Sequence, residues 1–279
     1  MMYEHQASTT GATAAKFLAL LNAEGAKGYR YVSDLAYSTE NNVTKSLLIK
    51  DAETTYTYEL LEATPASEAD FVQQANARGA RGFQYIGIYA QGLLYRKNNS
   101  SGATYSYLTK PNQFPRTKTR DYFLAQANEQ GADGYRYVQE YLFDSSGNTS
   151  ALYEKSAPGA IYSYEVPAGT PTTGDAFLAE LNAQGTKGFR LLEPYLFDAS
   201  FSTGNHIYVK DASQSTTFSY LLRDYLLPSA EMLAQANEEG AKGNGLLFVV
   251  PIMIPGKNIY YTPANCSGPL CDVHAPFIN

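Results

Sequence analysis

The chain has 279 residues, 44% of them hydrophobic, and a formal net charge of −6. This length suffices for a large core, and the acidic balance without a basic stripe excludes a nucleic-acid-binding protein held by phosphate contacts. No apolar run is long enough to cross a bilayer as a helix, so we expect no transmembrane segment.

The pattern N-x-x-G-x-x-G governs the organisation of the chain. It occurs five times at spacings of 52 to 55 residues, beginning at Asn22, Asn76, Asn128, Asn182 and Asn237. A fixed period indicates that one supersecondary unit was copied. We therefore predict five repeats at 1–50, 51–98, 99–155, 156–211 and 212–263, followed by a cysteine-containing C-terminal tail at 264–279.

Each repeat is predicted to open with a strand. In the second repeat, Tyr56 and Tyr58 alternate with Thr57 and Glu59, and this period of two with aromatic and β-branched residues is typical of a strand. Similar segments open the later repeats at 104–110, 161–167 and 217–223. Residues 2–7 are expected to be a divergent first copy of this strand.

A helix is predicted to follow. In the second repeat Ser67 is the expected N-cap, and Phe71 and Ala75 belong to one apolar face. We expect Gly79 to take the left-handed conformation just after the helix and Gly82 to provide a second permissive position. The Asn of the pattern is expected to tie the helix end to neighbouring backbone.

Two more strands complete the predicted unit. An aromatic-rich strand starts at Tyr29, Phe83, Tyr135 and Phe189, and a short strand starts at Ser46, Leu93, Ala151 and His206. Loops such as 98–102 are then expected to turn back into the next repeat as hairpins. The fold class is therefore α+β, with five tandem βαββ repeats. The fifth repeat departs from this pattern, because its strand from Leu246 is apolar on both faces, which indicates burial or a closing contact.

The helix end resembles a small bacterial domain of unknown function with the signature L-N-x-x-G-x-x-G-W-E-L-V in a βαββ unit. Tyr29, Phe83, Tyr135 and Phe189 stand where that signature has its tryptophan. The resemblance implies the fold alone, since the family has no established chemistry and transfers no catalytic residue.

Five such units can close into a pseudo-fivefold α/β propeller or extend as an open array, and the repeat pattern does not choose between them. If closed, their order resembles that of the pentein propeller of guanidino-group hydrolases and transferases. That resemblance implies a late cysteine nucleophile, Cys271 or Cys266, with His206 or His274 as base. The competing prediction is a disulfide between the two cysteines, because the Gly-Pro turn between them is typical of a tight closed loop.

Arg30, Arg136 and Arg190 occupy one repeated position, just after an aromatic residue. In a closed arrangement they would form a partial circle of cations able to bind an anionic ligand. The alternative, which we favour, is that each stacks on a tyrosine or pairs with a local carboxylate.

No metal or cofactor is predicted. The compact group Cys266, Cys271, Asp272 and His274 does not match the two separated ligand pairs of a structural zinc site, and residues 144–148 lack the distal Glu of a calcium loop. The paired glycines end a helix, whereas phosphate-binding loops precede one.

The amino-acid composition favours an extracytoplasmic protein. Charged residues make up 17% of the chain, below the roughly 25% of ordinary soluble domains. Met1 leads straight into Tyr3 and Glu4, so we expect the native signal peptide to be missing from this sequence. Tyrosine clusters recur in recognition surfaces, and Tyr141, Tyr195 and Tyr208 are candidates for an exposed surface that binds a protein or glycan.

The leading hypothesis is a non-enzymatic bacterial binding or scaffold module, because every recurrent residue has a structural explanation. The alternatives are a divergent pentein-like enzyme acting on a guanidino compound and an anion-binding ring that uses the three arginines.

Overall fold

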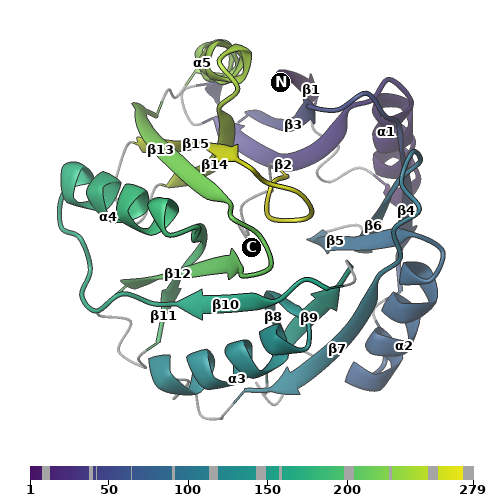
Figure 1. The fold of residues 1–279 in the computed structure, drawn as a ribbon. Coiled ribbons are helices and arrows are strands. Elements are labelled where there is room, and N and C mark those ends of the chain that lie inside the picture. Colours follow the sequence, from purple (N-terminus) through teal and green to yellow (C-terminus); the bar gives the residue numbers. More distant parts are fainter. Residues whose placement is uncertain are drawn as a thin grey trace.

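The computed structural model describes residues 1–7, 13–37, 40–41, 43–63, 65–89, 92–112, 119–142, 149–156, 159–197, 204–225, 228–250 and 257–272. Within these residues the chain is α+β, with five helices and five three-stranded antiparallel sheets. The five sheets lie around a common centre, and the helices lie at the periphery (Figure 1).

The same order of elements, strand–helix–strand–strand, occurs five times. The first unit contains β1 (Met2–Ala7), α1 (Ala14–Ala26), β2 (Arg30–Tyr37) and β3 (Val43–Lys50). The second contains β4 (Tyr56–Leu61), α2 (Glu68–Gly79), β5 (Phe83–Tyr89) and β6 (Gly92–Asn98). The third contains β7 (Ser106–Pro111), α3 (Arg120–Ala132), β8 (Arg136–Leu142) and β9 (Thr149–Lys155). The fourth contains β10 (Tyr162–Glu165), α4 (Gly174–Thr186), β11 (Arg190–Leu196) and β12 (Gly204–Asp211). The fifth contains β13 (Thr217–Asp224), α5 (Ser229–Ala241), β14 (Gly245–Val250) and β15 (Lys257–Ala264).

In each sheet the last strand of the unit is central. The strand orders are β1-β3-β2, β4-β6-β5, β7-β9-β8, β10-β12-β11 and β13-β15-β14. The predicted hairpin at 98–102 is wrong, because β6 is already paired on both sides, by β4 and β5, and β7 pairs with β9. Residues 98–102 therefore connect two sheets, and the hairpin joins β5 to β6 within the unit, where Tyr89 faces Gly92.

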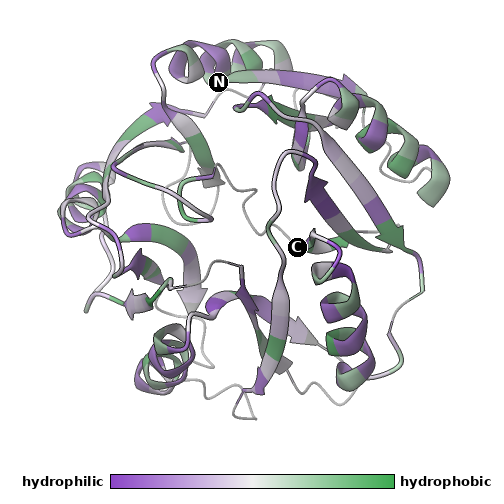
Figure 2. Ribbon diagram, turned by 45° about the vertical axis from the view of Figure 1, so that its right-hand side comes forward, coloured by the Kyte–Doolittle hydropathy of each residue, from purple (hydrophilic) through white to green (hydrophobic). Residues whose placement is uncertain are grey.

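Each helix packs against the first strand of the following unit. Helix α1 contacts β4, α2 contacts β7, α3 contacts β10 and α4 contacts β13. Helix α5 contacts β1, so the fifth unit meets the first (Figure 1). The helices carry both hydrophilic and hydrophobic residues along their length (Figure 2), as expected for helices with one buried face.

The Asn of the repeated pattern links each helix to that strand. Asn22 Nδ2 donates to the carbonyl of Tyr58 at 3.3 Å, and the Tyr58 amide donates to Asn22 Oδ1 at 2.8 Å. The same pair of bonds joins Asn76 to Tyr107, Asn128 to Tyr164, Asn182 to Tyr220 and Asn237 to Tyr3. The prediction that this Asn is structural is confirmed.

A tyrosine hydroxyl completes this contact. The amide of Tyr31 donates to the hydroxyl of Tyr58 at 2.8 Å, and the strand register shifts immediately after Tyr31, between Tyr31 and Ser33. A bulge re-aims one backbone group out of the ladder, and here that group reaches the next unit. The equivalent amides, each followed by the same shift, belong to Tyr85, Tyr137, Leu191 and Leu246, and they donate to Tyr107, Tyr164, Tyr220 and Tyr3. We call the Asn and Tyr bonds together the inter-unit contact.

The role predicted for the first glycine is wrong, and that for the second is confirmed. Gly79 is the last residue of α2, and a Cβ built on it would lie 2.0 Å from the carbonyl oxygen of Tyr105 in the next unit. Gly82 is the left-handed residue, with a φ of +88°. The first glycine is therefore required for close approach between units, and the second for the turn into the strand.

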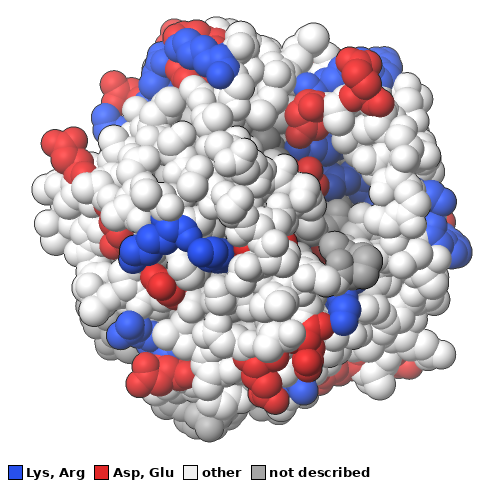
Figure 3. Space-filling view, in the orientation of Figure 1, with Lys and Arg blue, Asp and Glu red and all other residues white. Residues whose placement is uncertain are grey.

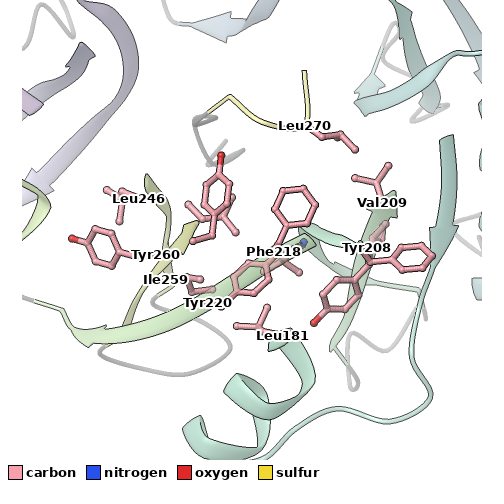
Figure 4. Packing of buried hydrophobic residues seen from close by; sticks show 14 of the residues in the cluster. Leu181, Tyr208, Val209, Phe218, Tyr220, Leu246, Ile259, Tyr260 and Leu270 are labelled. Atoms are coloured by element: carbon pink, nitrogen blue, oxygen red, sulfur yellow. Dashed lines mark hydrogen bonds between the residues drawn. The ribbon is translucent and has the colours of Figure 1, made fainter. Parts of the chain in front are cut away.

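The core is built from aromatic side chains. Phe17, Phe71 and Phe123 are at most 1% exposed, and each meets a tyrosine of its own unit edge-on: Tyr31, Tyr85 and Tyr137. Between the fourth and fifth units, Leu181 of α4 points toward Tyr220 of β13 (Figure 4). The tyrosines whose hydroxyls serve the inter-unit contact are buried as well, so they too pack as core residues: Tyr3, Tyr58, Tyr107, Tyr164 and Tyr220.

Candidate functional site

The arginines singled out in the sequence are buried near the centre of the molecule. Arg30, Arg136 and Arg190 begin β2, β8 and β11 and are 3%, 6% and 2% exposed. The equivalent residues of the other units are Gln84 and Gly245. We define the central cluster as Arg30, Asp51, Gln84, Arg96, Arg136, Glu154, Arg190, Tyr261 and Asp272.

In the first unit the arginine is neutralised by Asp51, the residue that follows β3. Arg30 Nε donates to Asp51 Oδ1 at 3.1 Å, and its Nη2 contacts Asp51 Oδ2. Burial is the largest single influence on the pKa of Arg30 and lowers it, but the charge and hydrogen bond of Asp51, together with Asp272 and Tyr56, leave the pKa raised. This is a buried, bidentate ion pair.

Glu154 joins the second and third units. Its side chain is 1% exposed, and it accepts from Arg136 Nη2 at 3.1 Å, from Gln84 Nε2 at 3.0 Å and from the Tyr107 hydroxyl at 3.1 Å. Arg96 Nη2 donates to Gln84 Oε1 at 3.3 Å. Burial lowers the pKa of Arg136, and Glu154 together with Tyr162 and Tyr164 leaves that pKa raised. A buried carboxylate with three donors is stable only as a complete network.

Arg190 is held differently. Its guanidinium lies over the ring of Tyr261, 4.7 Å from the centroid, which is a cation–π contact between the fourth and fifth units. Its Nε atom is buried and has no hydrogen-bond partner within the described part of the chain. Two of the three arginines are thus paired with a carboxylate and one is stacked on a tyrosine.

The C-terminal tail reaches the same place. Cys266 and Cys271 form a disulfide, as predicted. We call residues 265–272 the disulfide loop; it lies near the middle of the view in Figure 1. The Tyr261 hydroxyl donates to the backbone carbonyl of Asp272 at 2.7 Å, and Leu270 is buried at 3% exposure.

Electrostatic coupling places the charges of different units within reach of one another. Burial raises the pKa of Tyr105 to about 12, and charged groups from three parts of the chain also act on it: Glu154, Arg96, Asp272 and Arg136. In Figure 3, charged atoms of both signs lie in a hollow to the right of the centre. The cluster therefore mixes cations and anions rather than forming a circle of cations alone.

Among the described residues, those proposed for cysteine catalysis have other partners. Both sulfurs are in the disulfide, so neither is a thiolate in this structure. His206 is 4% exposed and lies between β12 and α4, where its Nδ1 is 2.7 Å from Glu180 Oε1 and its ring meets Phe177. His274 lies outside the described residues.

The three tyrosines predicted to be candidates for an exposed surface are all at least partly buried. Tyr141 and Tyr208 are buried, at 5% and 0%, and Tyr195 is half-buried, so the idea that they form an exposed surface is wrong for the first two. Each packs on an aromatic side chain or reaches a carboxylate, such as Glu180 for Tyr208.

Among the described residues no group of three or more His, Cys, Asp or Glu is placed to hold a metal ion, and none of the helices described is long and apolar enough to cross a membrane.

Most of the central cluster could not be found from the repeats. Arg96, Glu154 and Asp272 are not repeated, and the aspartate at Asp51 recurs only as Asp211, so periodicity gave little reason to select them. The one signal available was that the residue after the repeated aromatic differs between units.

Comparison of the chain with protein-family models, curated proteins and solved structures finds no match.

The disulfide is expected to stabilise the fold. Replacing both cysteines by alanine should lower the free energy of unfolding by about 2 kcal/mol, since the loop closed by the disulfide is short. Denaturant unfolding of the oxidised protein and the double variant would measure this. An unchanged unfolding midpoint would show that the hydrogen bonds of the disulfide loop hold it without the covalent link.

Proposed function

We propose that the chain is a non-enzymatic, extracytoplasmic binding module built as a closed α/β propeller with pseudo-fivefold symmetry. The observation that carries closure is the inter-unit contact, which joins Asn237 to Tyr3 with the same bonds that join Asn128 to Tyr164. A repeat array in which every unit has two neighbours needs no capping repeat.

Binding is assigned to the central cluster. The repeated Asn, Tyr and Gly residues are engaged in holding neighbouring units together, so they are unavailable for recognition. The five units differ at the centre, where the residue two positions after the second glycine of the pattern is Arg in three units, Gln84 in the second and Gly245 in the fifth. A rigid frame with a chemically varied centre suits recognition of one ligand. The broader partner class predicted from the sequence, a protein or glycan, stays a prediction.

The extracytoplasmic location is supported by the disulfide and by the weakly charged composition. Disulfides persist in oxidising compartments and are rare in the cytosol. In the native cells, both cysteines should resist alkylation until a reductant is added. Two cysteines that react without reduction would contradict the location.

The main competitor is a guanidino-modifying enzyme. A cysteine nucleophile must be a thiolate, so this alternative requires the disulfide to open and His206 or His274 to approach Cys271. The test is to incubate oxidised and reduced protein with arginine and agmatine and to measure release of ammonia or a ureido product. We expect none in either state. Turnover that disappears in Cys271→Ser would overturn the proposal.

A further inference from the structure

Arg190 and Arg30 occupy equivalent positions in their units but have different partners. Arg30 faces Ile49 in the strand register, and Arg190 faces Val209. In both units an aspartate stands two residues beyond the facing residue, Asp51 in the first and Asp211 in the fourth. The fourth unit therefore has an aspartate, Asp211, at the position of Asp51. Arg190 and Asp211 nevertheless do not form the ion pair that joins Arg30 to Asp51.

Asp211 is engaged by the turn that follows it. Its Oδ1 accepts from the amide of Ser213 at 2.9 Å and from the Ser213 hydroxyl at 2.6 Å, and its Oδ2 accepts from Gln214 Nε2 at 2.6 Å. The carboxylate thus caps the turn between β12 and β13. This leaves Arg190 without the neutralising partner that Arg30 has.

A buried guanidinium without an anion is an unfavourable arrangement. Removing a cation from water is costly unless a counter-charge or hydrogen-bond acceptors replace the water. The stacking of Arg190 on Tyr261 supplies part of this compensation. It does not satisfy Nε, which is buried with no acceptor among the described residues.

We propose that Arg190 is the anchor of an internal binding site for a small monocarboxylate. The site rests on the proposed binding function and names its ligand class. The planar guanidinium presents two parallel N–H donors, which fit the two oxygens of a carboxylate. Phe218 and Tyr220 pack around Tyr261, so the wall beside the anchor is aromatic and suits a short apolar body behind the carboxylate.

The charge around the site favours a single negative charge on the ligand. Asp272 and Asp51 both act electrostatically on Tyr261, the residue that Arg190 stacks on, and Arg30 does so with the opposite sign. One further anion balances Arg190, whereas a doubly charged phosphate or sulfate would add repulsion from the two aspartates.

The disulfide loop covers this region. Tyr261 presents its face to Arg190 and its hydroxyl to the backbone carbonyls of Cys271 and Asp272. The loop is fastened from the other side, where Gln214 Oε1 accepts from the amide of Ser267 at 2.9 Å. A ligand that binds Arg190, a residue that is 2% exposed, would therefore lie beside the disulfide loop.

The test uses acetate as the probe and thermal unfolding as the readout. Acetate and sulfate are compared at equal ionic strength in the wild type, in Arg190→Gln and in the surface control Arg223→Gln, whose side chain pairs with Glu238. Relative to sulfate, acetate should raise the Tm of the wild type and of Arg223→Gln by about 3 °C or more, and should leave Arg190→Gln unshifted. Equal shifts in all three proteins, or no shift in the wild type, would overturn the site.

Two further measurements test the proposed site independently of the acetate effect on Tm. Without carboxylate, Arg190→Gln should lower the Tm less than Arg136→Gln, because only Arg136 leaves a carboxylate, Glu154, unpaired. In the wild type, acetate should shift one arginine Nε–Hε NMR signal with saturation at one equivalent, and Arg190→Lys should remove that signal. Equal losses of Tm, or no saturable signal, would contradict the site. Neither result bears on guanidino turnover, so failure of the site is distinguishable from failure of the proposed function.

Discussion

Gly131→Ala is expected to destabilise the protein by about 3 kcal/mol or more, since overpacking against rigid backbone leaves no side chain to move. A Cβ at Gly131 would lie 2.1 Å from the carbonyl oxygen of Tyr162, the residue that begins the next unit's first strand. The helix and that strand would have to separate, which would strain the Asn128 contact with Tyr164 as well. Denaturant unfolding monitored by circular dichroism measures the loss.

Gly102→Ala is the matched control. Gly102 also lies between two units, but a Cβ built there meets nothing within 4 Å. We expect a change within about 0.5 kcal/mol, as for a surface substitution away from special features. Equal effects of the two substitutions would show that close approach between units is not what the first glycine of the pattern provides.

Glu154→Ala should have the second large effect, a loss of about 3–5 kcal/mol. The carboxylate accepts from Arg136, Gln84 and Tyr107, and removing it leaves a buried cation and two buried donors without their acceptor. Thermal and denaturant unfolding would measure the loss. The double variant Glu154→Leu with Arg136→Met should recover part of it, because removing both charges avoids the unpaired cation.

Glu59→Ala is the control for this prediction. Glu59 also pairs with arginine, Arg78 and Arg81, but its side chain is 34% exposed. Solvent-exposed ion pairs contribute at most about 1 kcal/mol. If Glu59→Ala cost as much as Glu154→Ala, burial of the central cluster would not be the source of its importance.

The sequence alone predicted the features of the repeat that depend on residues close together in the chain. Period-two alternation in segments such as 55–61 and the capping residue Ser67 identified the strand and the helix of the unit, because both depend on residues close in the chain. The structural role of Asn76 was also predictable, since a polar residue at a helix end in every copy has few other uses.

What depends on neighbouring units was not predictable. The role of Gly79 follows from Tyr105, which belongs to another unit, so the local sequence suggested a turn instead. The pairing of β6 on both sides likewise ruled out the expected hairpin. At the centre, Arg136 was found because its position repeats, whereas its partner Glu154 occurs once and carries no periodic signal.

Hydrogen exchange at five backbone amides tests closure of the propeller most directly. The amides of Tyr58, Tyr107, Tyr164 and Tyr220 donate to the Asn of the preceding unit, and the amide of Tyr3 donates to Asn237. If the fifth unit closes on the first, the protection factor of Tyr3 should lie within about tenfold of the other four, although Tyr3 is near a chain end where fraying is normal. A Tyr3 amide that exchanges at the rate of an unstructured peptide, while the other four remain protected, would contradict closure.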